Sequence, residues 1–147
     1  MQHDYDMAQT LFTILNPIYI TQKKKEVLRY EKEPYVMTAD ISLSPPYTGR
    51  GGWSWYTGSA GWMYQGLLNW FLGIRKEGNE LVIDPATPAD FGNFTIEYKY
   101  GSSYYEIRVE SRSKGNMTTE SIILDDKPIQ GNRIVLEDDG EKHHIMV

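Results

Sequence analysis

The sequence predicts an α+β fold with a helical N-terminal part and a C-terminal part made of β-strands. Apolar residues recur every three or four positions in the first part, whereas they alternate with polar residues after Gly78. Because these two periods belong to helices and strands respectively, the change marks a structural boundary. We therefore expect two parts, residues 1–77 and residues 78–147. The 147 residues of the chain have room for one domain or two very small ones.

The N-terminal part contains two segments with helical spacing. Residues 5–15 form the first, and Asn16-Pro17 ends it because the residue before a proline disfavours the helical region. Residues 60–74 form the second, with apolar side chains along one side. Between them we expect a short extended piece at residues 27–30 and a brief helix at residues 34–41, followed by a loop rich in proline and glycine.

The C-terminal part is predicted to be a series of short strands. The first begins at residues 81–83 and ends at Asp84-Pro85. A hairpin with one wet face follows, with strands at residues 94–100 and 105–110 and a turn at Gly101-Ser102. The remaining strands are expected at residues 121–124, 133–136 and 144–147, separated by turns at residues 125–128 and 138–140.

The loop before the second long helix combines glycines with aromatic side chains. Gly49, Gly51 and Gly52 permit positive φ angles and close approach of the backbone to a ligand. Trp53 and Trp55 add flat apolar faces with polar edges. Faces of this kind suit sugar rings, so the loop is a candidate binding site.

The start of the helix after this loop is a candidate anion site. Thr57, Gly58 and Ser59 would lie at its N-terminus, where backbone N–H groups lack intrahelical partners and the helix dipole is positive. Phosphate binds well at such a place. The alternative is that Thr57 or Ser59 only caps the helix.

Composition and charge indicate a folded protein and exclude several classes of function. Hydrophobic residues make up 40% of the chain, which is enough for a core, and the net charge of -5 argues against nucleic-acid binding. The short run Lys23-Lys24-Lys25 does not reverse this, and we interpret it as a solvated helix end or turn. With no cysteine, no apolar stretch near 20 residues and no signal pattern, we expect a cytoplasmic protein that does not contact membranes.

Paired carboxylates and histidines in the β-rich part have structural explanations. Asp125-Asp126 and Asp138-Asp139 lie in predicted turns, where aspartate caps its own backbone. His143 and His144 are neighbours on a strand and point to opposite faces, so we expect no metal site. Four tyrosines of the hairpin form either a sugar-binding platform or cross-strand packing; they are Tyr98, Tyr100, Tyr104 and Tyr105.

Several motifs in register resemble the inverting glycoside phosphorylases, which include the cellobiose and chitobiose phosphorylases. The longest is GRGGWSWYTGSAGWMYQ at residues 49–65; it is preceded by EPYV and ADI and followed by LGIR and IDP. The chain is most similar to the phosphorylase-like region of the cyclic β-1,2-glucan synthases. This resemblance implies N-terminal helices from the end of an (α/α) barrel, followed by an antiparallel β-sandwich.

The resemblance also implies roles for individual residues. It places phosphate on Thr57 and Gly58 of the TGSA motif, and a sugar on Glu33 of the EPY motif. Trp53 and Trp55 are sugar-binding candidates because of their flat aromatic faces. Glu33 is alternatively a residue at the start of a helix.

One position of the loop departs from the family. Tyr47 stands where the family has a histidine that contacts phosphate, and a tyrosine supplies no cationic imidazolium. Arg50 either compensates as a phosphate ligand or stabilises the loop.

What the chain lacks defines the function that we expect. The family's general acid is an aspartate well upstream of the EPY motif, and nothing before Glu33 resembles it. We therefore expect no catalytic residue and no activity for the isolated chain, which would be a truncated or split relative of these enzymes. The alternative is a non-catalytic carbohydrate-binding or interaction module. The expected partners are a β-glucoside or glucan and either an upstream barrel subunit or a second copy. No cofactor is expected, since inorganic phosphate is a co-substrate in the family.

Overall fold

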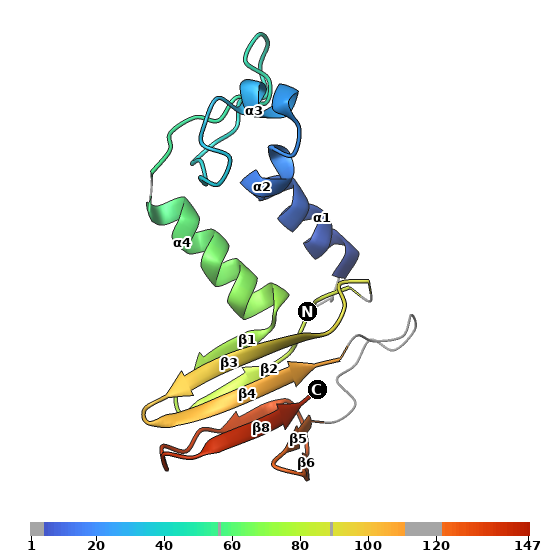
Figure 1. Cartoon of the computed structure of the whole chain (residues 1–147), viewed down its shortest axis with the longest axis vertical. Coiled ribbons are helices and arrows are strands. Elements are labelled where there is room, and N and C mark those ends of the chain that lie inside the picture. The colour runs from blue at the N-terminus through green and yellow to red at the C-terminus, as the bar shows by residue number, and fades with distance from the viewer. Residues whose placement is uncertain (1–4, 56, 89, 111–121) are drawn as a thin grey trace. The chain divides into compact units, whose positions relative to one another are not determined.

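The structure is a computed structural model that describes residues 5–55, 57–88, 90–110 and 122–147 (Figure 1). The chain divides into two compact units, Met1–Leu67 and Leu68–Val147. The first unit contains the α-helices, and the second contains two β-sheets. The predicted α+β class is thus confirmed. In the described ranges, no helix has the length and apolar character needed to cross a membrane.

Three consecutive helices begin the first unit. Helix α1 is Tyr5–Leu15, as predicted, and α2 is Pro17–Ile20. The side chain of Asn16 accepts a hydrogen bond from the N–H of Ile18 at 3.0 Å, so the residues that end α1 also start α2. Helix α3 is Lys24–Tyr30, which shows that the extended piece predicted at residues 27–30 was wrong.

The sequence of α3 explains this helix. Glu26 lies in its first turn and Arg29 in its last turn, and both charges interact favourably with the helix dipole. Glu31 follows in the left-handed conformation, with φ of 54°, and ends the helix.

The helix predicted at residues 34–41 is absent. Pro34 and Tyr35 form a turn in which the N–H of Val36 donates to the carbonyl of Glu33 at 3.0 Å, and the chain then becomes extended. The last helix, α4, is Thr57–Gly66 and is followed by a π-helical turn, Leu67–Phe71. The predicted helix over residues 60–74 was therefore wrong at both ends, because it starts earlier and Ile74 already belongs to a strand.

The second unit contains a three-stranded sheet and a five-stranded sheet. The first has the order β1-β2-β7, with β1 Ile74–Glu77, β2 Glu80–Ile83 and β7 Arg133–Val135. The second has the order β3-β4-β8-β5-β6, with β3 Phe94–Tyr100, β4 Ser103–Val109, β8 Lys142–Met146, β5 Ile122–Leu124 and β6 Lys127–Ile129. The predicted hairpin is confirmed, and β6 occupies part of a predicted turn. Ser121, the first residue of the predicted strand 121–124, lies outside the described residues.

One strand pair corrects the expectation of a purely antiparallel arrangement. Strand β4 runs parallel to β8, with Tyr105 opposite His143 and Ile107 opposite Ile145. A parallel pair needs a long connection, and here three other strands lie between β4 and β8 along the sequence. The five-stranded sheet is therefore mixed.

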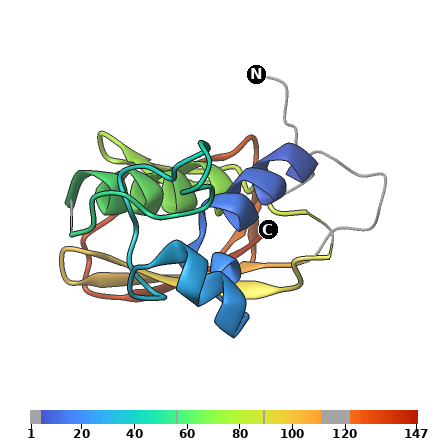
Figure 2. The same ribbon diagram turned by 90° about the horizontal axis from the view of Figure 1, so that it is seen from above.

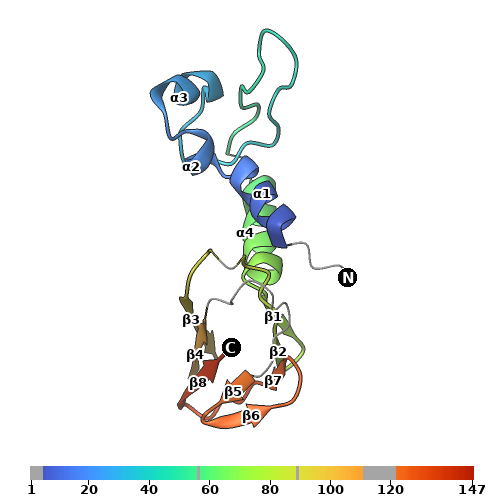
Figure 3. The ribbon, with the colours of Figure 1, turned by 90° about the vertical axis from the view of Figure 1, so that its right-hand side faces the viewer.

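The two sheets share one hydrophobic core. Figure 3 shows β3, β4 and β8 facing β1, β2 and β7. Alternate residues of β4 are buried, as the period of two predicts, and they meet apolar side chains of β1, β2 and β7. The buried residues of this core are Ile74, Leu81, Ile83, Tyr105, Ile107, Val109, Ile122, Ile134, Leu136 and Ile145.

Substitutions at two glycines of the second unit can test how tightly the chain is packed on either side of β1. Gly73 and Gly78 both have positive φ, 70° and 65°. A Cβ at Gly73 would collide with the backbone of Asp84 and Pro85, whereas a Cβ at Gly78 would meet nothing within 4 Å. We expect Gly73→Ala to lower the free energy of unfolding by more than about 3 kcal/mol, through backbone strain and overpacking together. Gly78→Ala should cost only about 1 kcal/mol of strain.

Urea unfolding followed by circular dichroism measures both variants. Equal losses of stability in the two variants would contradict the close packing of Gly73 against Asp84.

Candidate functional site

The loop between α3 and α4, teal in Figure 2, is held in a ladder of backbone hydrogen bonds. The N–H of Ser42 donates to the carbonyl of Arg50, and the N–H of Gly52 donates to the carbonyl of Asp40, both at 2.9 Å. The N–H of Ala39 donates to the carbonyl of Trp53, also at 2.9 Å. Residues 39–42 and 50–53 thus pair like two antiparallel strands, which fixes the backbone of the glycine-rich segment.

A buried tyrosine anchors this ladder to α3. Tyr30 is only 1% exposed, and its hydroxyl donates to the carbonyl of Val36 at 2.9 Å. Its own carbonyl accepts a hydrogen bond from the N–H of Gly51 at 2.8 Å. Gly51 leaves no room for a side chain, because a Cβ there would lie 2.8 Å from both the Lys32 side chain and the Thr38 methyl group.

The two loop tryptophans predicted to bind a sugar are largely exposed. Trp53 is 71% exposed and Trp55 is 70% exposed, although their backbone lies in or beside the ladder. Trp55 also has a positive φ of 65°, which is rare for a bulky residue. Both side chains therefore lie largely at the surface, in or beside the hydrogen-bonded ladder.

Arg50 and Tyr47 form a cluster at the far end of the loop. The Nε of Arg50 lies 2.8 Å from a carboxylate oxygen of Glu31, and the guanidinium lies 5.2 Å from the centroid of the Tyr47 ring. Both side chains of the ion pair are about half exposed, so the pair adds little stability. The contacts of Arg50 with Glu31 and Tyr47 are those expected if Arg50 stabilises the loop. They also place the positive charge of Arg50 beside the loop.

The remaining predicted residues lie before and after the ladder. Glu33 is half-buried and its carbonyl closes the turn to Val36. The backbone of Thr57 begins α4, and its side chain lies outside the described part of the structure. Gly58 is exposed, and a Cβ there would meet no heavy atom within 4 Å. The backbone at the start of α4 is thus open on this side.

A groove with a volume of ≈ 570 Å³ runs beside the ladder. Its lining includes Lys32, Asp40, Tyr47, Arg50, Gly52 and Trp53. Sequence reasoning missed Lys32 and Asp40, because nothing in their local pattern shows that the backbone pairing places them beside the glycines. The groove joins part of the predicted sugar site to these two charged side chains.

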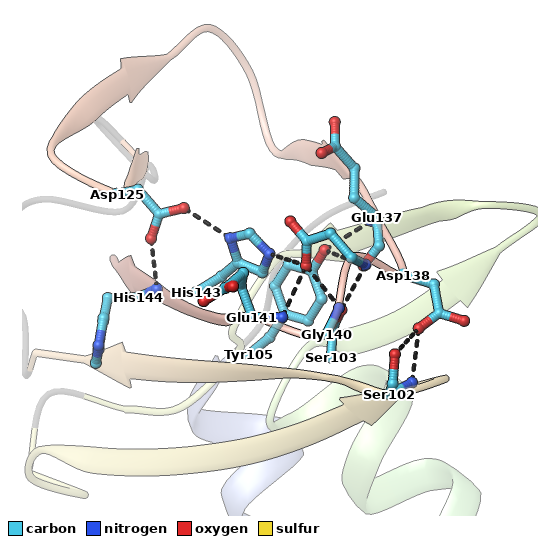
Figure 4. A network of polar contacts seen from close by, with 11 residues as sticks. Ser102, Ser103, Tyr105, Asp125, Glu137, Asp138, Gly140, Glu141, His143 and His144 are labelled. Atoms are coloured by element: carbon cyan, nitrogen blue, oxygen red, sulfur yellow. Dashed lines mark hydrogen bonds and ion pairs between the residues drawn. The ribbon is translucent and has the colours of Figure 1, made fainter.

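Three of the four paired aspartates of the second unit, Asp125, Asp138 and Asp139, belong to a polar network (Figure 4). Asp138 accepts hydrogen bonds from the N–H and the hydroxyl of Ser102, both at 2.6 Å. Asp139 accepts from the buried hydroxyl of Ser103 at 2.9 Å, and Ser103 accepts in turn from the N–H groups of Asp139 and Gly140. These aspartates hold the β3–β4 turn against the turn before β8, which is a structural role.

A histidine connects two of these turns. His143 Nδ1 lies 2.7 Å from Asp125 Oδ2, and His143 Nε2 lies 3.2 Å from Asp139 Oδ1. The ring stacks on Tyr105 with centroids 4.6 Å apart. Hydrogen bonding to Asp125 raises the pKa of His143 above its ordinary value. Within the residues that the structure describes, no three side chains are arranged to hold a metal ion.

The four hairpin tyrosines do not form one exposed surface. Tyr98 lies opposite Tyr105 in the β3–β4 ladder. Tyr105 is buried, and its hydroxyl donates to the carbonyl of Glu137 at 3.0 Å. Tyr104 is exposed on the other face, beneath the amine of Lys99, which lies 5.4 Å from its ring centroid. This arrangement is the one expected from cross-strand packing.

Comparison with known proteins shows which family the chain resembles. Residues 4–73, which include α1 to α4 and the whole loop, match the glycosyl hydrolase 94 superfamily, catalytic domain. The chain is thus similar to this family of glycoside phosphorylases and related proteins, and the resemblance predicted from the GRGGW and TGSA motifs is confirmed.

Individual relatives show the same sequence similarity. The chain is 36% identical over 121 residues to the cyclic beta-(1,2)-glucan synthase NdvB of Rhizobium meliloti (strain 1021). The aligned region covers 82% of this chain and 4% of that protein. It is 32% identical over 144 residues to an N,N'-diacetylchitobiose phosphorylase of Vibrio proteolyticus, covering 97% of this chain and 17% of that protein. A 3-O-beta-D-glucopyranosyl-beta-D-glucuronide phosphorylase of Paenibacillus borealis is 42% identical over 69 residues, covering 47% of this chain and 9% of that protein. The chain thus spans only a small part of each relative.

The His143 network predicts how the stability of the second unit depends on pH. The pKa of His143 is raised, so its contribution to stability is complete below about pH 6.5 and is lost as the pH rises through the folded-state value. Burial raises the pKa of Asp125, but its hydrogen bonds to His143 and to the N–H of His144 outweigh this and the net shift is downward. The Asp125 contribution is therefore present above about pH 4 and lost as the pH falls.

We expect the free energy of unfolding to fall by about 1 kcal/mol between about pH 6 and about pH 8. The variant His143→Asn should lack this dependence, whereas His144→Asn should keep it, because the His144 side chain is 62% exposed. Urea unfolding across the pH range measures both. The same slope in wild type and His143→Asn would show that another group titrates.

Proposed function

We propose that the first unit carries the phosphate- and sugar-contacting loop of a glycoside phosphorylase-like protein. The observation that supports this most strongly is that the family match at residues 4–73 includes a loop with an ordered backbone and two tryptophans about 70% exposed. Exposed aromatic side chains beside a hydrogen-bonded loop backbone offer a ligand flat apolar surfaces. A hexose presents an apolar face of C–H groups that stacks on such rings.

In this proposal, phosphate binds at the start of α4, on Thr57 and Gly58. The first-turn N–H groups of a ten-residue helix lack intrahelical partners and lie at the positive end of its dipole. The open side of Gly58 allows a ligand to approach the backbone closely. Arg50 adds positive charge near the loop, although it also pairs with Glu31.

The sugar is proposed to lie on Trp53 and Trp55, with Glu33 accepting hydrogen bonds from its hydroxyls. A carboxylate has two acceptor oxygens and can bind two hydroxyl groups together. The substrate class is a β-glucoside or a β-linked glucan. This assignment follows the names of relatives such as the cyclic beta-(1,2)-glucan synthase, which are enzymes many times longer than this chain.

We propose that the isolated chain binds these ligands without cleaving a glycosidic bond, and we assign no catalytic residue. A glycosidic oxygen is a poor leaving group until it is protonated, and a positioned acid contributes about 10²- to 10⁴-fold to the rate. No carboxylate before Glu33 resembles the family's acid. The second candidate function, a non-catalytic carbohydrate-binding module, is favoured by the same exposed tryptophans.

Helix α1 supports the proposal of a protein partner. Its exposed apolar residues include Met7, Leu11, Ile14 and Leu15, each about half exposed. A large exposed apolar patch usually marks an interaction surface. We propose that a barrel subunit or a second copy of the chain covers this face, and that the assembly is cytoplasmic.

Glucan binding tests the sugar site, with a matched control. We expect Trp53→Ala to weaken binding of a linear β-1,2-linked glucose oligosaccharide by at least about tenfold, because the ring proposed to stack on the sugar is lost. Trp62→Ala removes the same side chain from α4, where Trp62 is 82% exposed and outside the loop, and should bind like wild type. Isothermal titration calorimetry avoids any dependence on tryptophan fluorescence. No heat of binding by the wild type at millimolar oligosaccharide would refute the sugar site.

Phosphate binding tests the role of Tyr47. Below about pH 6.5, Tyr47→His supplies an imidazolium, and we expect it to bind inorganic phosphate several times more tightly than wild type. The gain should vanish at high pH, and Tyr47→Phe should show none. Titration followed by phosphorus NMR measures the affinity. Neither variant should release glucose 1-phosphate from a β-linked glucose disaccharide, and release by the purified chain would contradict the proposed lack of turnover.

A further inference from the structure

The groove beside the loop contains two charged side chains, Asp40 and Lys32, for which the described residues provide no hydrogen-bonding or ion-pair partner. In the part of the chain that the structure describes, neither the Asp40 carboxylate nor the Lys32 amine takes part in a hydrogen bond or an ion pair. Both line the same groove as Trp53. This differs from the aspartates of the second unit, whose carboxylates are occupied by neighbouring N–H and hydroxyl groups.

The ladder fixes Asp40 directly beside a glycine. The carbonyl of Asp40 accepts the N–H of Gly52 at 2.9 Å, so the two residues face each other across the ladder. The Asp40 carboxylate occupies the space where a side chain at position 52 would begin. Gly52 does not have a positive φ, so its lack of a side chain serves this close approach and not a backbone conformation. The absence of a side chain at Gly52 thereby leaves room for the exposed Asp40 carboxylate in the groove.

We propose that Asp40 is a further sugar-contacting residue, which accepts hydrogen bonds from two adjacent hydroxyls of a hexose unit lying in this groove. This inference rests on the proposed sugar site and extends it, because Trp53 at the groove provides the stacking face for the same ring. Lys32 donates to a sugar oxygen. Asp40 therefore selects for the hydroxyl pattern of the ring, while the tryptophan recognises only its apolar face.

The shape and chemistry of the groove fit this ligand class. The groove is shallow and open to solvent, so a hexose unit can reach its side chains directly. Acceptor and donor groups beside an aromatic face match a neutral ring with many hydroxyls. A site that hydrogen-bonds a hydroxyl discriminates strongly against an analogue that lacks it, because its polar groups are then left unpaired.

A double-mutant cycle on Asp40 and Gly52 tests this inference. Calorimetric titration with a linear β-1,2-linked glucose oligosaccharide compares the wild type, Asp40→Ala, Gly52→Ala and the double variant. We expect each single variant to bind about tenfold more weakly or worse, because Gly52→Ala displaces the carboxylate that Asp40→Ala removes. The double variant should bind no more weakly than Asp40→Ala. Asp126→Asn, an aspartate of the second unit, serves as a control and should bind like wild type.

The outcomes separate this inference from the proposed sugar site. If Asp40→Ala binds as tightly as wild type while Trp53→Ala binds weakly, the sugar site stands and the role of Asp40 is overturned. If the wild type does not bind the oligosaccharide, the proposed sugar site and the role of Asp40 are both refuted. Additive losses in the double variant would contradict the positioning of the carboxylate by Gly52. Loss of selectivity between glucose and its deoxy analogues in Asp40→Asn would support the role in recognising hydroxyls.

Discussion

The candidate site depends on one buried side chain, Tyr30. Its ring fills the space beside Gly51, its hydroxyl binds the carbonyl of Val36, and its carbonyl binds the N–H of Gly51. These contacts join the end of α3 to both sides of the loop. Each buried hydrogen bond contributes only about 1 kcal/mol, yet leaving its partner unsatisfied costs more, so the three contacts favour one loop conformation. An ordered loop is what allows Trp53 and Trp55 to stay exposed without collapsing onto the protein.

Asp40 differs from three aspartates of the second unit in the hydrogen bonds of its carboxylate. Asp125, Asp138 and Asp139 accept several hydrogen bonds each, and the pKa of each is lowered as a result. Such groups have little capacity left for a ligand, and they stabilise turns. Asp40 has a carboxylate that no described group binds, in a groove beside an aromatic ring. Hydrogen-bond capacity, and not residue type, therefore distinguishes the binding candidate from the structural residues.

The sequence predicted the second unit better than the first. Strands β3 and β4 are long enough for seven alternating residues each, and the Gly101-Ser102 turn between them makes the pattern unambiguous. Helix α3 has only seven residues, too few to show a helical period, and its Tyr30 is buried against residues that follow the helix. The end of the helix before β1 was missed for a similar reason. Gly73 takes a positive φ there because Asp84 approaches its backbone, and this contact is remote in sequence.

The part of the site whose residues are close together in the sequence could be predicted from the sequence. The glycines, the tryptophans and the TGSA motif lie within a short run of sequence, so their chemistry and the family resemblance were visible together. Asp40 and Lys32 were not, because their place in the groove follows from pairing between residues 39–42 and 50–53. That pairing replaces the helix which residues 34–41 were expected to form. When the local preference for helix or extended structure is weak, a segment adopts the conformation in which its backbone hydrogen bonds are satisfied. Residues 39–42 find these hydrogen bonds on residues 50–53, which can approach closely because Gly51 and Gly52 have no side chains.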